Sequence, residues 1–248
     1  MLANTFPITL IESKMISKYV KHFQFSTELN PAFNYIAGQF ITIHFEKNGK
    51  MLKRSYSIAN IPEHDNRIEF AAGFVKDGPG TELLFNLKPG DKINISGPFG
   101  RLILKNDEVK RYILVATSTG VTPYRAMLKE LETRFKQNPF LKVIILHGVQ
   151  KSADVLYKED FLNFAAKHPN QFEFRAHLSR GQDEALANHE CLGYVQSSFN
   201  NLQLNPNEDL VYLCGNPGMI DESFAYLKEQ GFGMQQIIRE KYISAPTR

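Results

Sequence analysis

The chain has 248 residues, of which 43% are hydrophobic and 22% charged, a composition typical of globular proteins and a length that fits two ordinary domains. No apolar run approaches the roughly 18 residues needed to cross a bilayer, and no secretory signal pattern is visible, so we expect no membrane association. The net charge of +3 is too small to indicate binding to nucleic acid.

The chain contains two cysteines, Cys191 and Cys214, which lie far apart and lack the spacing of metal ligands. This usage predicts a reduced, cytoplasmic protein without a metal site. No four-cysteine pattern is present, so we expect any iron–sulfur centre to belong to a separate partner.

The positive charge is unevenly distributed. Residues 1–104 contain 12 Lys and Arg against 9 Asp and Glu, whereas residues 105–248 contain 17 of each kind. The excess mildly favours docking of an acidic partner on the first half. Scattered, solvated charges explain it equally well.

The first half of the chain consists of short β-branched or aromatic runs separated by turn signals such as Asn48-Gly49 and Pro89-Gly90. Several short strands with regular turns predict a small antiparallel barrel, with one helical insert from Thr81 to Leu87. The expected strands are Lys18 to Ser26, Gln39 to Phe45, Arg67 to Val75 and Lys92 to Ser96.

The stretch Arg54-Ser55-Tyr56-Ser57 offers a cation, an aromatic ring and hydroxyls within four residues. In a strand, Arg54 and Tyr56 point to one face, and Ser55 and Ser57 to the other. This arrangement suits a large flat ligand that carries phosphates. Taken alone, the same pattern also fits an ordinary barrel strand.

The stretch Gly78-Pro79-Gly80-Thr81 is a glycine-rich loop that enters a helix. The free backbone amides and the positive end of the helix dipole favour a phosphate at such a position. A plain turn with Thr81 as the N-cap is an equally good interpretation.

The second half, after a charged connector from Lys105 to Arg111, alternates strand and helix patterns. The continuous apolar run from Tyr112 to Ala116 predicts a parallel strand buried on both faces. We expect Thr122 to cap the following helix, with Pro123 in its first position. Asn216 and Pro217 start a later helix. The fold class is therefore a two-domain protein, with an antiparallel β-barrel followed by an α/β domain on a parallel sheet. Ligands bind such open sheets at the C-terminal strand ends.

A series of motifs in one fixed order resembles the ferredoxin–NADP⁺ reductase superfamily, as a bacterial-type member, over nearly the whole chain. The matching segments are Arg54 to Ser57, Gly78 to Thr81, Gly97 to Gly100, Ala116 to Pro123, Leu156 to Glu159, Ser179-Arg180, Tyr194 with Gln196, and Cys214 to Met219.

The resemblance implies that residues 1–104 form an FAD-binding barrel domain. Arg54 would pair with the pyrophosphate, Tyr56 would stack on the isoalloxazine, and Ser57 would hydrogen-bond near its N5 atom. The implied FAD-binding residues are Arg54, Ser55, Tyr56, Ser57, Ala71, Ala72, Gly73, Gly78, Gly80 and Thr81.

The resemblance also implies that residues 105–248 form an NADP-binding domain. A hydroxyl followed by a guanidinium, as in Ser179-Arg180, suits a 2′-phosphate. Tyr194 would stack on the adenine. The implied NADP-binding residues are Thr119, Gly120, Ser179, Arg180, Tyr194, Gln196, Cys214, Gly215, Asn216 and Pro217.

The implied catalytic residues are Ser57, Cys214, Glu240 and Tyr242. Cys214 would position the nicotinamide and would not act as a nucleophile. Glu240 would also help to position the nicotinamide. Tyr242 would cover the flavin face, so it also counts as a cofactor-binding residue, and would move aside for the nicotinamide.

The sequence departs from the family pattern in two ways that bear on the site. Ala116 and Ser118 stand where glycines are usual, which leaves open how closely the backbone approaches the phosphates. Six residues follow Tyr242, which leaves both Tyr242 and the tail 243–248 as candidates for covering the flavin.

The implied activity is that of an NADPH-dependent FAD oxidoreductase of the ferredoxin–NADP⁺ reductase type. It would exchange a hydride between NADP(H) and FAD, and single electrons with an acidic carrier, ferredoxin or flavodoxin, as a monomer. Two alternatives are the reductase component of an oxygenase or a ferric or free-flavin reductase, and a non-catalytic flavin-binding electron-wiring subunit.

Overall fold

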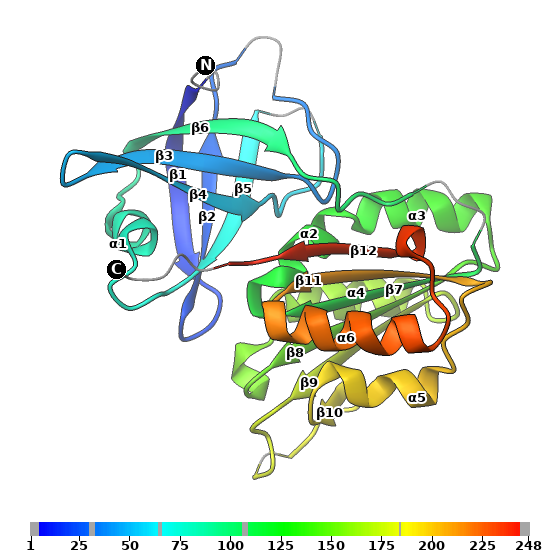
Figure 1. Cartoon of the computed structure of the whole chain (residues 1–248). Coiled ribbons are helices and arrows are strands. Elements are labelled where there is room, and N and C mark those ends of the chain that lie inside the picture. The colour runs from blue at the N-terminus through cyan, green and yellow to red at the C-terminus, as the bar shows by residue number, and fades with distance from the viewer. Residues whose placement is uncertain (1–4, 30–32, 64–65, 106–108, 184, 244–248) are drawn as a thin grey trace. The chain divides into compact units, whose positions relative to one another are not determined.

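The computed structural model describes residues 5–29, 33–63, 66–105, 109–183 and 185–243, which divide into two compact units (Figure 1). The first unit is built from the chain up to Leu104 together with Thr122–Met127. The second is built from Lys105–Val121 and from the described residues that begin at Leu128.

The first unit is an antiparallel sheet with strand order β4-β3-β6-β1-β2-β5. An antiparallel bridge between Ile58 and Phe70 joins the two edges of this sheet, so the predicted antiparallel barrel is confirmed. Its elements are β1 (Phe6–Met15), β2 (Val20–Ser26), β3 (Phe40–Lys47), β4 (Lys50–Ser57), β5 (Arg67–Gly73), α1 (Pro79–Asn86) and β6 (Lys92–Phe99).

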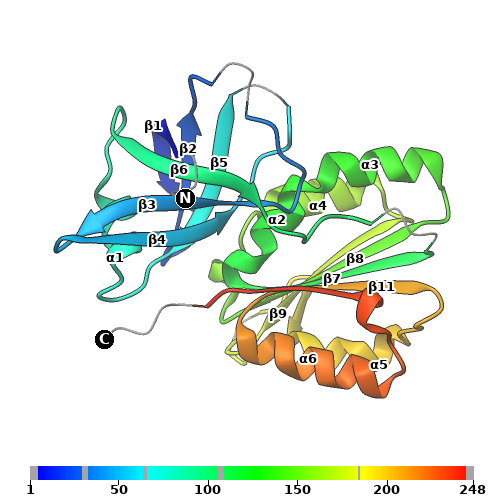
Figure 2. The same ribbon diagram turned by 45° about the horizontal axis from the view of Figure 1, so that its top comes forward.

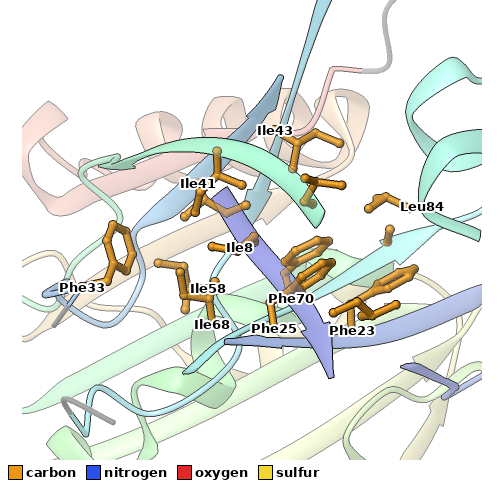
Figure 3. Close-up of a cluster of buried hydrophobic side chains, with 14 residues drawn as sticks. Ile8, Phe23, Phe25, Phe33, Ile41, Ile43, Ile58, Ile68, Phe70 and Leu84 are labelled. Atoms are coloured by element: carbon orange, nitrogen blue, oxygen red, sulfur yellow. The ribbon is translucent and has the colours of Figure 1, made fainter. Parts of the chain in front are cut away.

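The core of the barrel is aromatic. Phe70 on β5 stacks on Phe23 and on Phe25 of β2, with ring centroids 5.5 and 5.4 Å apart, and isoleucines from the facing strands surround the three rings (Figure 3). Each such ring pair contributes about 0.5–1.5 kcal/mol beyond the burial of its area. The core therefore gives β4 and β5, which carry predicted site residues, a rigid backing.

The second unit is a parallel sheet with strand order β10-β9-β8-β7-β11-β12, which confirms the predicted α/β domain. Residues 112–116 of β7 are all buried, as the continuous apolar run predicts. The strands are β7 (Arg111–Thr117), β8 (Lys142–Val149), β9 (Phe172–Leu178), β10 (Glu190–Leu192), β11 (Asp209–Gly215) and β12 (Ile237–Lys241).

Helices cover both faces of the parallel sheet. The helices α3 (Leu128–Gln137) and α4 (Lys158–Lys167) lie on one face, and α5 (Phe199–Leu202) and α6 (Pro217–Glu229) on the other (Figure 2). Within the described ranges, no helix is both long and apolar enough to cross a membrane. The remaining short elements are η1 (Ser118–Val121), α2 (Thr122–Ala126), η2 (Ser152–Asp154), η3 (Val195–Ser198) and η4 (Met234–Gln236).

The structure contradicts two of the capping interpretations and confirms a third. Gly78, not Thr81, is the N-cap of α1. Thr122 is not a cap, because the turn η1 runs directly into α2 and leaves no extended residue before it. Asn216 does cap α6, and its Oδ1 accepts hydrogen bonds from two backbone amides, at 2.8 and 3.3 Å, with Pro217 next in the chain.

Candidate functional site

The structure brings Arg54, Tyr56 and Gly80 together in the first unit. Arg54 and Tyr56 are half-buried on β4, and Gly80 lies in the first turn of α1. A Cβ atom on Gly80 would stand 2.8 Å from Arg54 Cγ and 3.2 Å from Tyr56 Oη. The absence of a side chain at residue 80 is therefore what allows the helix to approach the strand.

The start of α1 presents backbone amides beside the Arg54 side chain. Gly80 and Thr81 lie in the first turn, where no preceding helical carbonyl is available to accept their amide hydrogens. The Thr81 hydroxyl donates to the carbonyl of Val75 at 3.0 Å, which ties down the loop that leads into the helix. Free amides, the helix dipole and a guanidinium together suit a phosphate or pyrophosphate.

The Tyr56 ring is held by packing. It stacks on Phe70 with centroids 5.0 Å apart and an interplanar angle of 25°. Burial raises the pKa of the Tyr56 hydroxyl to about 12, although the charge of Arg54 opposes the shift. The phenol therefore stays neutral at physiological pH and offers a fixed aromatic ring.

The two serines of the motif differ in their surroundings. The Ser55 side chain is exposed on the opposite face of β4 from Arg54 and Tyr56, and it hydrogen-bonds Thr42 of β3 at 3.0 Å. Only the backbone of Ser55 is available to a ligand beside Arg54. Ser57 is buried at the end of the strand.

The segment Ala71–Gly73 ends β5, and its two alanines are buried.

Two residues before this segment, Glu69 lies at the centre of a polar cluster that the sequence did not reveal. Its carboxylate lies 3.3 Å from His22 and 3.1 Å from Arg125. Burial alone would raise the pKa of Glu69, but hydrogen bonds and charges from His22 and Arg125 outweigh it and lower the pKa. The three residues lie far apart in sequence, so no local pattern could have linked them.

In the second unit, the predicted NADP-binding residues lie along one edge of the sheet. All the strands are parallel, so the loops that follow them share the C-terminal edge. The strand order places Tyr194 after β10 at one end, then Ser179-Arg180 after β9. The turn η1 follows β7, Gly215-Asn216 closes β11, and Tyr242 follows β12.

At the β10 end of this edge, the Tyr194 side chain is 73% exposed and that of Arg180 is exposed. Ser179 Oγ donates to the carbonyl of Val149 at 3.2 Å. Gln196 does not project freely, because its Nε2 donates to Glu222 Oε2 on α6 at 2.9 Å. An aromatic ring and a guanidinium are thus accessible together, as an adenosine phosphate would require.

In the middle of the edge, two glycines allow the loops after β7 and β11 to interlock. A Cβ atom on Gly120 would stand 2.4 Å from the carbonyl oxygen of Cys214, and one on Gly215, whose φ is +118°, would stand 2.5 Å from Thr117 Oγ1. The Thr117 hydroxyl also accepts a hydrogen bond from the amide of Asn216 at 2.8 Å. Thr117, the last residue of β7, lies inside the motif Ala116 to Pro123, but the sequence did not single it out, because its partner Asn216 lies 99 positions further along the chain.

At the β12 end, Cys214, Glu240 and Tyr242 come together. Cys214 lies opposite Glu240 in the strand register, and the Tyr242 amide donates to the carbonyl of Gly215 at 2.8 Å. Burial raises the pKa of the Cys214 thiol well above its ordinary value, the charge of Glu240 adds to this, and a hydrogen bond with the Tyr242 side chain opposes it. The thiol is therefore neutral and cannot serve as a nucleophilic thiolate.

Neither half of the site resembles a metal centre, because among the described residues no three His, Cys, Asp or Glu side chains are grouped so as to hold an ion. What the residues do fit is a pair of nucleotides. The glycine cradle beside Arg54 suits a flavin pyrophosphate, and the row of strand-end loops suits a dinucleotide. The tail from residue 244 onward lies outside the described residues, so its predicted role stays a prediction.

Two family models match the two halves of the chain. An oxidoreductase FAD-binding domain matches residues 7–103, and an oxidoreductase NAD-binding domain matches residues 114–223. The first match contains the Arg54–Gly80 cradle, and the second contains the loops that follow β7 to β11.

Individual proteins agree with these domain matches. The chain is 30% identical over 229 residues to a ferredoxin–NADP reductase of Azotobacter vinelandii, covering 86% of this chain and 85% of that protein. It is 28% identical over 213 residues to the toluate 1,2-dioxygenase electron transfer component of Pseudomonas putida, covering 85% and 60%.

Among solved structures, the ferredoxin NADP⁺ reductase of Neisseria gonorrhoeae with bound FAD and NADP superposes with a TM-score of 0.83 at 21% identity, covering 96% of this chain and 99% of that one, and so shares the fold. The two domain matches and the 30% identity to the Azotobacter vinelandii reductase show that the chain belongs to the ferredoxin–NADP reductase family of flavoenzyme oxidoreductases.

Proposed function

We propose that the protein exchanges a hydride between NADP(H) and FAD and exchanges single electrons with a small carrier such as ferredoxin or flavodoxin. The observation that carries this proposal is the cradle in which Gly80 meets Arg54 and Tyr56, since it combines an anion site with a fixed aromatic ring. Residues 1–104 would bind FAD, and residues 105–248 would bind NADP(H).

In the FAD domain, each residue has a distinct task. Arg54 and the first-turn amides of Gly80 and Thr81 hold the pyrophosphate. The neutral ring of Tyr56 would support the isoalloxazine, Ser57 would hydrogen-bond near its N5 atom, and the backbone of Ala71–Gly73 would lie against the ring. When bound, FAD supplies the step between two-electron and one-electron chemistry.

In the NADP domain, the accessible Arg180 supplies a cation for the 2′-phosphate, and Ser179 lies next to it. Tyr194 provides a stacking surface for the adenine. Thr119 and Gly120 lie where the loops of β7 and β11 interlock, which suits the phosphates nearer the nicotinamide.

The neutral Cys214 thiol acts as a packing and positioning group for the nicotinamide. Burial raises the pKa of this thiol and so disfavours the thiolate, which is the form that would attack electrophiles. Glu240 and Tyr242 border the same place, and Tyr242 would have to move aside for the nicotinamide.

An anaerobic stopped-flow experiment tests the proposal. The yellow protein is mixed with NADPH and, separately, with NADH, while the flavin absorbance band is followed. Fast bleaching by NADPH and slow bleaching by NADH is the expected result.

Replacement of Arg180 by Gln should weaken the apparent affinity for NADPH about tenfold and leave that for NADH unchanged, because only NADPH carries the 2′-phosphate. An FAD-containing protein that neither nucleotide bleaches would overturn the proposal and favour the electron-wiring subunit.

The likeness to an oxygenase electron transfer component favours a second candidate, a reductase that serves an oxygenase. Parallel assays with ferredoxin, flavodoxin, free FMN and ferric chelates separate the candidates by the acceptor that is reduced fastest. The positive excess on residues 1–104 supports an acidic carrier as partner. We further propose that the protein is a monomer and that it is cytoplasmic; the two unpaired cysteines support the compartment.

A further inference from the structure

The first residue of the loop that carries Thr119 and Gly120 has an unusual backbone conformation. Ser118, at the start of η1, has a φ of +47°, in the left-handed region that residues other than glycine seldom occupy. Its side chain is exposed and gains nothing from burial. Some other interaction must therefore hold the backbone of Ser118 in this state.

That interaction comes from the neighbouring strand. His147 on β8 is completely buried, and its Nε2 atom lies 3.0 Å from the carbonyl oxygen of Ser118. A carbonyl oxygen can only accept, so Nε2 must carry the proton. The other ring nitrogen, Nδ1, is buried and has no hydrogen-bond partner among the described residues. Among the described residues, the imidazole therefore makes a single polar contact, and its partner is the loop that begins at Ser118.

The protonation state of His147 suits this contact. Burial lowers its pKa from 6.5 to about 4, although the hydrogen bond to Ser118 opposes the shift. The ring is therefore neutral at physiological pH and has a single proton to place. Packing against Phe174, with ring centroids 6.3 Å apart, fixes its orientation.

We propose that His147 is a positioning residue for the dinucleotide: it holds the Ser118 carbonyl, and so keeps the loop with Thr119 and Gly120 in the conformation that receives the cofactor's phosphates. This inference rests on the proposed function of that loop. It predicts that His147 governs the affinity for NADP(H) without affecting FAD. It also predicts that the need for His147 arises because residue 118 is not glycine.

A double-mutant cycle tests this dependence. The dissociation constant of NADP⁺ is measured from the flavin difference spectrum of the FAD-containing protein. His147→Phe should raise this constant about tenfold, which corresponds to about 1.4 kcal/mol. In a Ser118→Gly background the same substitution should raise it about twofold or less, because glycine adopts the left-handed conformation without help. Equal losses in the two backgrounds would overturn the inference.

A matched control separates this effect from a general loss of a histidine. His168 lies among Phe135 and Phe164, just after α4 and at the opposite edge of the sheet. His168→Phe should change the dissociation constant of NADP⁺ by less than about twofold, and FAD content should be unchanged in every variant. A loss as large as that of His147→Phe would overturn the inference.

A measurement on the unaltered protein covers the case in which His147→Phe does not fold. Nitrogen-15 NMR of histidine-labelled protein should show the His147 ring as the neutral Nε2–H tautomer, and an Nδ1–H tautomer would overturn the inference. If the unaltered protein shows this tautomer but binds no NADP⁺, the proposed function fails and the positioning role fails with it. Normal binding of NADP⁺ without coupling between residues 147 and 118 would overturn only the positioning role.

Discussion

At the scale of single residues, the site depends on places where a side chain would not fit. Gly80 and Gly120 both have ordinary backbone angles, so their conformation does not require glycine. They are required because a Cβ atom would collide, with the Arg54 stem in one case and with the carbonyl of Cys214 in the other. Small residues at such positions allow the backbone to come close to another chain segment and to the ligand.

Replacement of Gly80 by Ala should weaken FAD binding. The new methyl group would lie 2.8 Å from Arg54 Cγ, so the arginine has to move from its place beside the first-turn amides. Overpacking of this kind costs about 1–3 kcal/mol, and we expect the dissociation constant of FAD to rise about tenfold or more. Titration of the FAD-free protein with FAD measures this dissociation constant.

Pro79→Ala is the control for this prediction, because it alters the same helical turn without adding an atom near Arg54. Its dissociation constant for FAD should stay close to that of the unaltered protein. If Gly80→Ala binds FAD as tightly as Pro79→Ala does, the cradle is not where the pyrophosphate lies.

At the scale of elements, the two helix N-termini of the site are used differently. The N-cap of α1 is Gly78, which has no side chain that could accept hydrogen bonds from the first-turn amides. Those amides therefore stay available to a ligand. The first turn of α6 is already satisfied, because Asn216 Oδ1 accepts from Gly218 and Met219. We therefore expect α1 to bind phosphate directly, and α6 to contribute mainly its dipole and the placement of the Gly215-Asn216 backbone.

Two substitutions of Asn216 separate capping from cofactor binding. Asp caps a helix about as well as Asn does, so Asn216→Asp should preserve thermal stability. It adds a negative charge beside the expected phosphates and should raise the KM for NADPH severalfold. Asn216→Ala removes the cap and should cost about 1 kcal/mol of stability. A lower thermal midpoint for the alanine variant and an unchanged one for the aspartate variant is the expected pair of results. An unchanged KM for NADPH in Asn216→Asp would remove α6 from the cofactor site.

At the scale of the whole molecule, buried histidines make the stability of the fold depend on pH. The second unit buries His147 and His177, and burial lowers the pKa of each from 6.5 to about 4. Between these values the unfolded chain binds more protons than the folded one, so stability falls as pH falls through this range. Each histidine contributes a loss of about 3 kcal/mol by pH 4.

Replacement of His177 by Phe should therefore reduce the sensitivity of the protein to acid. His177 Nε2 contacts Ser198 Oγ at 3.0 Å, so the variant starts with a lower thermal midpoint at pH 7. Its midpoint should then fall by roughly 5–10 °C less than that of the unaltered protein between about pH 7 and pH 4.5. Scanning calorimetry at the two pH values measures both drops. Equal drops in the midpoints of the two proteins would mean that His177 is already protonated in the folded state at pH 4.5.

The amino-acid sequence by itself determined the fold class, and it supplied most of the candidate site residues, whose roles stay predictions. Alternating runs such as the one that became β2, and the continuous apolar run of β7, depend on local periodicity, which the sequence displays directly. The motifs around Arg54, Gly78 and Cys214 are equally local. Helix capping was less predictable: Asn216 was assigned correctly, whereas Thr81 and Thr122 were not, because the preceding backbone decides which residue is extended.

Only the tertiary structure decided which of these residues meet. Gly80 touches Arg54, Cys214 meets Tyr242, and His147 holds Ser118 because strand order and register bring distant segments together. No periodicity encodes the distance between two such segments. The left-handed backbone of Ser118 also depends on the tertiary structure, since a contact from another strand has to offset its strain. The chemistry of each residue can be read along the chain, but the contacts that constrain it arise from the packing of the whole sheet.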